Sequence, residues 1–518
     1  MTSEVNLMTR TWPLLTTLLV ASCNVREAPL EPLAVREAPA ARAAAPSASG
    51  ILPFPPDAPP SCATLRDVGV SDIVRLEGTT LFYADRVGGL TIVDVADPAR
   101  PRQLAVVPFA GMPLGLFVRE GVAWLVLIDT DGRGTAPVRT MVRAVDVRRP
   151  AAPRVIGEEV REGSARDVTL VGGFLYLLRR AGTSRSIVES FGVEGTRLAP
   201  RGLVTLEGAP AQLAASPAGL AVVTTSDEHA DVAWLDLSLE TAGSLLLRRS
   251  VRLPGGIASW DRGEGKLVDA DEGQRVRLVM CATAACSPAG PAILRIVDFA
   301  TAERARRPTS LRLTEHDGLP TTRFRDGVLY VAETSSSGAE SSMLHVIDTE
   351  AATPRFVAHH PLRGKIAALV PHESSLVALG TIGSPETQVR LIVHDLDVRR
   401  HFAPRTRTSV SFGSDWTWSV IMDDERAMSF DPASHLVAVP FTAWRHADSR
   451  YVTGTQLVDL QPIAGRTGPT LGEGGWVERA VFLDGHLLTL GPSGITSIDY
   501  ASSRTPDLGE TSIDTGRR

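Results

Sequence analysis

The chain has 518 residues, with 53 Lys and Arg against 59 Asp and Glu, and a formal net charge of −6 at pH 7. No basic cluster is dense enough to follow a nucleic-acid backbone or an anionic bilayer, which indicates that nucleic acid is not a partner. Beyond the N-terminal apolar run, no stretch is long enough to span a membrane as a helix. The sequence therefore predicts membrane contact only through a lipid anchor.

Residues 1–22 are predicted to be a lipoprotein signal peptide. Arg10 precedes an apolar run from Trp12 to Ala21, which is too short for a bilayer because a spanning helix needs roughly 20 residues. The following Val-Ala-Ser-Cys resembles the signals of bacterial lipoproteins, which implies that Cys23 becomes the lipidated first residue of the mature chain. The alternatives are an ordinary secretory signal with a chance cysteine, and a start at Met8 instead of Met1.

Residues 23–60 are predicted to be a disordered tether rich in Pro and Ala. Nine prolines occur in the 37 positions 24–60, and Val-Arg-Glu-Ala-Pro occurs at 25–29 and again at 35–39. Such a segment cannot bury enough apolar surface to fold alone. The tether would hold the following domain away from the membrane.

Residues 61–518 repeat a unit of about 50 residues, built from a turn, an apolar strand and a second strand ending in Asp. The second strand reads Leu-Thr-Ile-Val-Asp-Val at 90–95, with versions at 142–147 and 294–299. The turn glycines are Gly78, Gly121, Gly173, Gly219, Gly265, Gly327 and Gly485. This period, with about four short strands per unit and no amphipathic helix, predicts an all-β fold with one β-propeller.

The number of blades follows from the same repeat. A direct count gives nine units, whereas propellers typically have roughly four to eight blades. We therefore predict about eight blades, within a range of seven to nine. One over-read unit is expected between Gly219 and Gly327, where the spacing stretches.

An Asp ends the second strand of most units, and we predict that it accepts hydrogen bonds from N–H groups of the next turn rather than acting in catalysis. The clearest copies end at Asp94, Asp146 and Asp298, and weaker copies end at Asp236, Asp348, Asp395, Asp459 and Asp499.

Two local motifs suggest a metal or a disulfide. Asp129 and Asp131, in Asp-Thr-Asp-Gly-Arg-Gly, could place oxygens around calcium, or the segment is a plain hairpin turn without the later ligands of a full loop. Cys281 and Cys286 are predicted to form a disulfide in an exported chain, which leaves Cys62 as the odd thiol. No cofactor is predicted, because the sequence has no Walker loop, dinucleotide fingerprint, nucleophile elbow or zinc-protease motif.

The C-terminal section carries the most specific resemblance. The segment 416–432, from Trp416 through Asp423-Asp424-Glu-Arg to Pro432, resembles the closing region of bacterial and archaeal secreted proteins with a C-terminal β-propeller domain. Residues 89–98 resemble the LVIVD repeat. The resemblance implies an exported propeller of undefined function, with Asp423 and Asp424 as candidate ligand-binding residues and no catalytic residue.

Trp416 and Trp418 are further candidates for ligand binding. They are two residues apart on a predicted strand, so they lie on the same face. Between blades they would be core, which the following apolar residues of the strand favour; at the channel mouth they would form an aromatic platform for sugar or peptide.

Two functions remain open at this point. The first is a lipid-anchored, non-enzymatic binding or scaffold propeller at the bacterial outer membrane, monomeric, with a protein or polysaccharide ligand. The second is an envelope hydrolase or lyase with its site in the central channel. An enzyme would need three or more acidic or His side chains that converge on one channel point with shifted pKa values.

Overall fold

The computed structural model describes residues 68–85, 87–129, 138–193, 198–226, 228–237, 243–255, 268–270, 274–281, 291–305, 307–314, 320–334, 341–383, 388–400, 402–413, 416–431, 433–445, 449–460, 466–471, 476–500 and 510–513. All of them belong to one compact unit, Val35–Arg518. The predicted signal peptide and tether lie outside the described residues.

The described residues form nine antiparallel sheets, called sheets 1 to 9 in chain order. Sheet 1 holds β2 (Val74–Glu77), β3 (Thr80–Asp85), β4 (Gly89–Asp94) and β5 (Arg102–Val107). Sheet 2 holds β6 (Met112–Arg119), β7 (Val122–Asp129), β8 (Arg139–Asp146) and β9 (Arg154–Glu162). Sheet 3 holds β10 (Ala165–Val171), β11 (Phe174–Arg180), β12 (Arg185–Gly192) and β13 (Ala199–Glu207), and β1 (Val68–Val70) pairs with β10.

The next three sheets follow the same order. Sheet 4 holds β14 (Ala209–Ser216), β15 (Gly219–Thr225), β16 (His229–Leu237) and β17 (Leu245–Pro254). Sheet 5 holds β18 (Val268–Ala270), β19 (Arg275–Cys281), β20 (Ala292–Asp298) and β21 (Thr309–Arg312), with the short helix α1 (Ala302–Ala305) before β21. Sheet 6 holds β22 (Thr321–Arg325), β23 (Val328–Thr334), β24 (Ser341–Asp348) and β25 (Arg355–Arg363).

Sheet 8 differs from the other two sheets of the last third. Sheet 7 holds β26 (Lys365–His372), β27 (Ser375–Ile382), β28 (Arg390–Asp397) and β29 (Arg405–Phe412). Sheet 8 holds β30 (Trp416–Trp418), β31 (Ser429–Asp431), β32 (Leu436–Arg445), β33 (Arg450–Asp459) and β34 (Arg466–Leu471), with the 3₁₀ turns η2 (Val420–Met422) and η3 (Glu425–Ala427) between β30 and β31. Sheet 9 holds β35 (Arg479–Leu483), β36 (His486–Gly491), β37 (Gly494–Asp499) and β38 (Glu510–Ile513).

Five of the seven predicted turn glycines have positive φ, whereas Gly219 is the first residue of β15 and does not. At the β22–β23 turn, Asp326 and Gly327 both have positive φ, at 49° and 74°, and Asp484 and Gly485 repeat this at 44° and 80°. Two consecutive residues with positive φ are typical of the type I′ turn, which joins adjacent antiparallel strands tightly. Gly265 lies outside the described residues.

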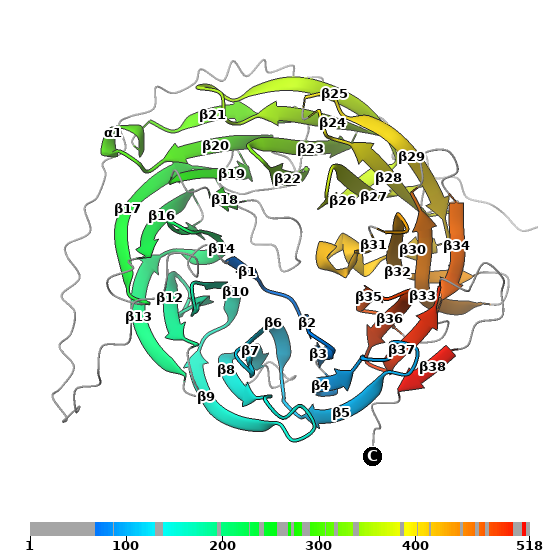
Figure 1. The fold of residues 1–518 in the computed structure, drawn as a ribbon. Coiled ribbons are helices and arrows are strands. Elements are labelled where there is room, and N and C mark those ends of the chain that lie inside the picture. The colour runs from blue at the N-terminus through cyan, green and yellow to red at the C-terminus, as the bar shows by residue number, and fades with distance from the viewer. Residues whose placement is uncertain are drawn as a thin grey trace, which may run out of the picture. The chain divides into compact units, whose positions relative to one another are not determined.

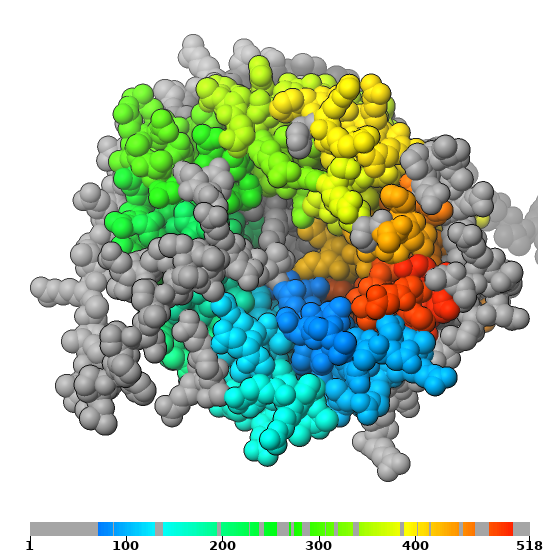
Figure 2. Space-filling model, viewed as in Figure 1, coloured from blue at the N-terminus to red at the C-terminus, as the bar shows by residue number. Residues whose placement is uncertain are grey.

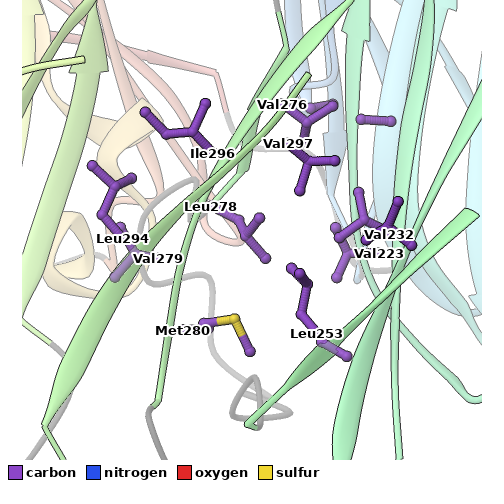
Figure 3. Close-up of a cluster of buried hydrophobic side chains, with 14 of the residues drawn as sticks. Val223, Val232, Leu253, Val276, Leu278, Val279, Met280, Leu294, Ile296 and Val297 are labelled. Atoms are coloured by element: carbon purple, nitrogen blue, oxygen red, sulfur yellow. The ribbon is translucent and has the colours of Figure 1, made fainter. Parts of the chain in front are cut away.

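The hydrophobic core lies between neighbouring sheets. The second strand of a sheet, such as β3 or β7, buries apolar side chains on both of its faces, and every core cluster draws on at least two adjacent sheets. The largest cluster joins sheets 4, 5 and 6 through residues such as Val223, Leu278 and Leu329, and Figure 3 shows part of it. A single sheet could not bury both faces, so the sheets depend on one another.

The first and last sheets close the ring. Leu81 and Tyr83 of β3 share a buried cluster with Leu488 and Leu490 of β36. In Figure 2 the blue first sheet lies directly against the red ninth sheet. Figure 1 shows the nine sheets around a common centre, with the first strand of each sheet innermost. The chain is therefore an all-β propeller, and its nine sheets fall within the predicted range of seven to nine.

The blade count differs from the preferred value of eight because the unit between Gly219 and Gly327 is a real one. Sheet 5 lies there as a sheet of its own. The spacing stretches because residues 255–267 separate β17 from β18, not because two units were counted where one exists. Among the described residues, no helix is long and apolar enough to cross a membrane.

Candidate functional site

Four of the strand-end aspartates cap turns, as predicted: Asp94, Asp146, Asp298 and Asp348. Asp236 instead accepts from the indole N–H of Trp234 and pairs with Arg248. Asp94 accepts a hydrogen bond from the N–H of Ala96 at 3.1 Å, and Asp146 accepts one from Arg148 at 3.1 Å. In sheet 7 the same role belongs to Asp397, which accepts from the N–H of Arg399 at 3.0 Å. The assignment of Asp395 as the capping residue is wrong by two positions, because Asp397 and not Asp395 pairs with the first residue of the preceding strand.

Several predicted residues lie wholly or partly outside the described residues. Asp129 ends β7, but Asp131 is not described, so the calcium site stays a prediction. Cys281 is disulfide-bonded, yet Cys286 is not described and the pairing stays a prediction. Cys23 also lies outside the described residues. In the described ranges, no group of three or more His, Cys, Asp or Glu side chains is arranged to hold a metal ion.

The inner strand of sheet 8 is interrupted, and the predicted C-terminal residues lie at this interruption. β31 pairs with the start of β32 and β30 with its end, while η2 and η3 leave the sheet between them. Pro440 lies in the middle of β32, where it has no N–H to offer to an inner strand. Ser419 fixes the departure, because its hydroxyl donates to the carbonyl of Pro440 at 2.6 Å and accepts from the N–H of Ile421 at 3.2 Å.

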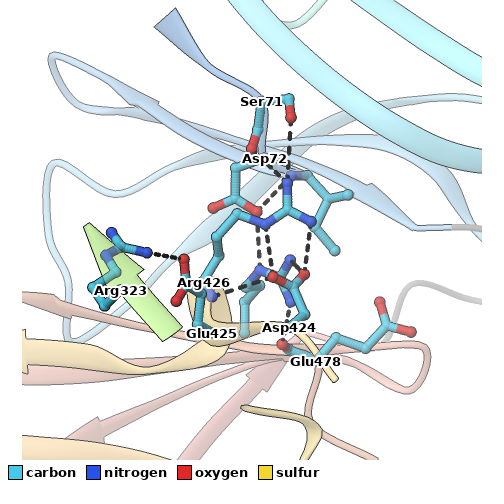
Figure 4. A network of polar contacts seen from close by, with 9 residues as sticks. Ser71, Asp72, Arg323, Asp424, Glu425, Arg426 and Glu478 are labelled. Atoms are coloured by element: carbon cyan, nitrogen blue, oxygen red, sulfur yellow. Dashed lines mark hydrogen bonds and ion pairs between the residues drawn. The ribbon is translucent and has the colours of Figure 1, made fainter. Parts of the chain in front are cut away.

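The excursion carries Asp424 into a partly buried ion-pair cluster, which we call the clasp: Asp72, Asp424, Arg426 and Arg479 (Figure 4). Arg479 donates from Nε to Asp72 at 3.0 Å and from Nη2 to Asp424. Arg426 donates from Nε to Asp424 at 2.6 Å and from Nη1 to the carbonyl of Ser71 at 2.6 Å. The clasp thus joins sheets 8 and 9 to the segment that leads into sheet 1.

Electrostatics fix the charges of the clasp. Burial alone would raise the pKa of Asp424, but Arg479 and Arg426 outweigh it and hold that pKa at about 2. Burial alone would lower the pKa of Arg479, but Asp72 and Asp424 outweigh it and raise it. Asp424 and Arg479 therefore stay ionised near neutral pH.

Two more carboxylates approach the clasp. Glu425 bonds to Arg323 of β22, and Glu478 accepts a hydrogen bond from the Tyr83 hydroxyl at 2.8 Å. Glu425 and Glu478 thus bond to different elements, and of these four carboxylates only Asp72 and Asp424 share a described cation, Arg479. Asp424 also has a lowered pKa, whereas a general acid working near pH 7 needs a raised one. The arrangement is that of a structural cluster.

Aromatic side chains form a row on one face of sheet 8. Trp416 of β30 is paired in register with Trp444 of β32, and Trp444 with Tyr451 of β33. Residues paired in this way share a face. The rings of Trp444 and Tyr451 lie 4.8 Å apart, and Trp418 stacks on Trp476 at 5.5 Å.

We call these five residues, Trp416, Trp418, Trp444, Tyr451 and Trp476, the aromatic row. Trp416 is 42% exposed and Tyr451 65% exposed, while Thr417 between the two strand tryptophans is buried. The core interpretation of Trp416 is therefore wrong, because the sheet buries the opposite face of β30. Four of the eight tryptophans of the chain lie in this row.

The structure separates the predicted residues from one another. Asp424 joins the clasp, whereas Asp423 closes η2 with its backbone N–H, which donates to Val420 at 3.0 Å. Trp416 and Trp418 join the aromatic row. Sequence reasoning missed Trp444 and Tyr451, although both flank the turn of one hairpin at equal distances from it, which is a signal of cross-strand pairing.

A comparison with family models agrees with the fold. The model of the LVIVD repeat matches residues 69–105, so the chain is a β-propeller protein with LVIVD-like repeats. No curated protein matches the chain. Among solved structures, Sqt1 of Saccharomyces cerevisiae is similar with 12% identity and a TM-score of 0.42, over 76% of this chain and 93% of that one. BamB of Moraxella catarrhalis is similar with 13% identity and a TM-score of 0.40, over 76% and 98%.

Proposed function

We propose that this chain is an exported, lipid-anchored, non-enzymatic binding module of the bacterial cell envelope, which binds polysaccharide through the aromatic row. The exposed, register-paired aromatic rings of sheet 8 are the observation that carries the proposal. The lipoprotein-like N-terminus and the Pro-rich tether support the envelope location. The module is proposed to act as a monomer held off the outer membrane.

The chemistry of the row favours a carbohydrate chain. Tryptophan and tyrosine rings offer flat apolar faces with a polar edge, so they can pack against the C–H faces of sugar rings while the hydroxyls stay hydrated. Trp416 and Trp418 are two residues apart on a strand, which spaces them by roughly 7 Å. Such a row can contact successive units of an extended polymer. A peptide ligand is the alternative outcome of the test below.

Replacing Trp416 and Trp418 together with alanine is expected to weaken retention on an insoluble cell-wall polysaccharide by about tenfold or more, because exposed aromatic anchors dominate binding surfaces. Retention is measured by depletion of the full chain from solution over increasing amounts of polysaccharide. Phe402→Ala is the matched control, since Phe402 lies in the connection between β28 and β29, is 49% exposed and lies outside the row. It should bind like the wild type.

Equal retention of the double variant and wild type would remove the row as the binding surface. Competition by unstructured peptides, with no binding to any polysaccharide, would make the ligand a peptide. Release of soluble sugar fragments by the wild-type chain alone would revive the hydrolase or lyase alternative with its site in the central channel.

Replacing Cys23 with serine is expected to release the protein from membranes into the soluble fraction, because the thiol needed for lipid attachment is lost. Metabolic labelling with a fatty acid and membrane fractionation measure this. Ser22→Thr serves as the control, since it leaves the thiol in place. Equal labelling of wild type and the Cys23 variant would contradict the anchor.

A further inference from the structure

A pocket of about 300 Å³ lies between sheets 7 and 8, away from the clasp. Its walls include Asp395 and Arg407 of sheet 7, and Phe430, Val437 and Leu460 of sheet 8 or just after it. This volume is at the lower end of the range for small-molecule sites.

Asp395 has no counterpart in the other units. In sheet 7, Asp395 stands two residues before Asp397, the last residue of β28. At the same position of the equivalent strand, the other eight sheets have a residue that is not ionisable: Ile92, Ala144, Ser190, Trp234, Ile296, Val346, Leu457 and Ser497. A carboxylate at this one place breaks the pattern of the repeat. Positions that break a repeat or a packing rule are where function is expected.

Asp395 is only 3% exposed, and one of its oxygens has no partner. Oδ1 accepts no hydrogen bond from any residue that the structure describes, while Oδ2 lies 3.5 Å from Nη1 of Arg407, at the limit of a hydrogen bond. A buried carboxylate oxygen without a donor is costly. A donor from a bound molecule would relieve that cost.

The charges around the pocket leave one carboxylate uncompensated. The pocket is lined by two guanidinium groups, those of Arg399 and Arg407. Both donate to Asp397, which does not line the pocket. Asp395 and Asp431 add two further carboxylates, and Asp431 is bonded to the neutral hydroxyls of Ser434 and Tyr500. Arg325, which donates to the carbonyl of the lining residue Ser375, is paired with Asp326, so four carboxylates share three cations.

His372 adds an acceptor to the pocket and no charge. Burial lowers its pKa, so the imidazole is neutral at pH 7, and its ring stacks on Phe430 at 4.3 Å. A neutral imidazole has one nitrogen that accepts a hydrogen bond. The pocket therefore combines free acceptors, a net negative charge and aliphatic walls.

We infer that this pocket binds a small molecule through a primary ammonium group, with the ammonium against Asp395 and an aliphatic stem against Val437 and Leu460. An ammonium group carries three donors and one positive charge, which match the acceptors and the uncompensated carboxylate. The site is independent of the aromatic row.

Calorimetric titration of the full chain with n-butylammonium tests this site, and 1-butanol serves as the uncharged probe of the same shape. We expect n-butylammonium to bind and 1-butanol not to bind. Asp395→Asn should weaken n-butylammonium binding by about tenfold to a hundredfold, since it removes the charge from the hydrogen bond. Asp348→Asn is the matched control in sheet 6, where the carboxylate caps a turn and lies 3.8 Å from Arg355, and it should bind like the wild type.

A second variant separates a binding role from a structural one. Asp395→Val places here the kind of apolar residue found in sister units, so it should abolish binding while the unfolding temperature stays equal or rises. If Asp395 serves only as a partner of Arg407, both variants lower the unfolding temperature and the wild type binds no n-butylammonium. Equal binding of 1-butanol, or full binding by Asp395→Asn, would also overturn the inference.

Discussion

Replacing Arg479 with methionine lowers the free energy of unfolding by about 3 to 5 kcal/mol, the usual cost of removing one partner from a buried ion pair. Arg479 is buried and bonds to both Asp72 and Asp424. Without it, two half-buried carboxylates lose the cation that they share. Arg426 still neutralises part of the charge on Asp424, which places the expected loss near the lower end of this range.

The effect depends on pH with a defined sign. The pKa of Asp424 is lowered in the folded chain from 3.8 to about 2, so its ion pairs stabilise the fold above pH 4 and lose this contribution as the pH falls towards 2. The difference between wild type and Arg479→Met should therefore shrink between about pH 5 and 2. Denaturant unfolding at pH 7 and at pH 3 measures both quantities.

Arg102→Met is the matched control for Arg479→Met. Arg102 is exposed and bonds to Asp94 at 3.0 Å, and exposed ion pairs contribute about 0 to 1 kcal/mol. If Arg479→Met lowers the free energy of unfolding by no more than Arg102→Met does, the clasp does not hold sheet 9 to the start of sheet 1.

The sequence repeat predicts the fold, but it does not predict which residues of the first and last units contact each other. Leu-Thr-Ile-Val-Asp-Val and its copies report local hairpins, because alternation and turn residues act over a few positions. Asp72 and Arg479, by contrast, are 407 residues apart, and Tyr83 and Glu478 are 395 apart. No local pattern encodes which residues of the first and last units meet when the ring closes.

For the candidate site, the sequence predicts only which side chains share a face of a strand, because successive side chains of a strand alternate between its two faces. Trp416 and Trp418 were correctly expected on one face, but which face is buried depends on the neighbouring sheets. The repeat predicts a cap at Asp395 because this residue ends a weak copy of the second strand, but the register shows the cap to be Asp397. Aligning each unit on its cap would have exposed Asp395 as the one ionisable residue at its position.

Replacing Trp234 with alanine is expected to lower the free energy of unfolding by about 3 to 5 kcal/mol, whereas Trp416→Ala should change it by only about 0.5 kcal/mol. Trp234 is 1% exposed in the cluster that joins sheets 4, 5 and 6, and it stacks on Phe299 of the next sheet at 6.1 Å. Its indole N–H donates to Asp236 at 2.9 Å. Truncation would open a cavity between sheets and release that hydrogen bond.

The space for this indole is provided by the turn glycine of the same unit. A Cβ built on Gly219 would lie 2.5 Å from Cζ2 of Trp234, so Gly219→Ala should also destabilise the fold, through crowding rather than through backbone strain. Denaturant unfolding of Trp234→Ala and Trp416→Ala, followed by circular dichroism, measures the contrast. If Trp416→Ala costs as much as Trp234→Ala, the aromatic row is packed rather than open to a ligand, and the proposed binding surface is lost with it.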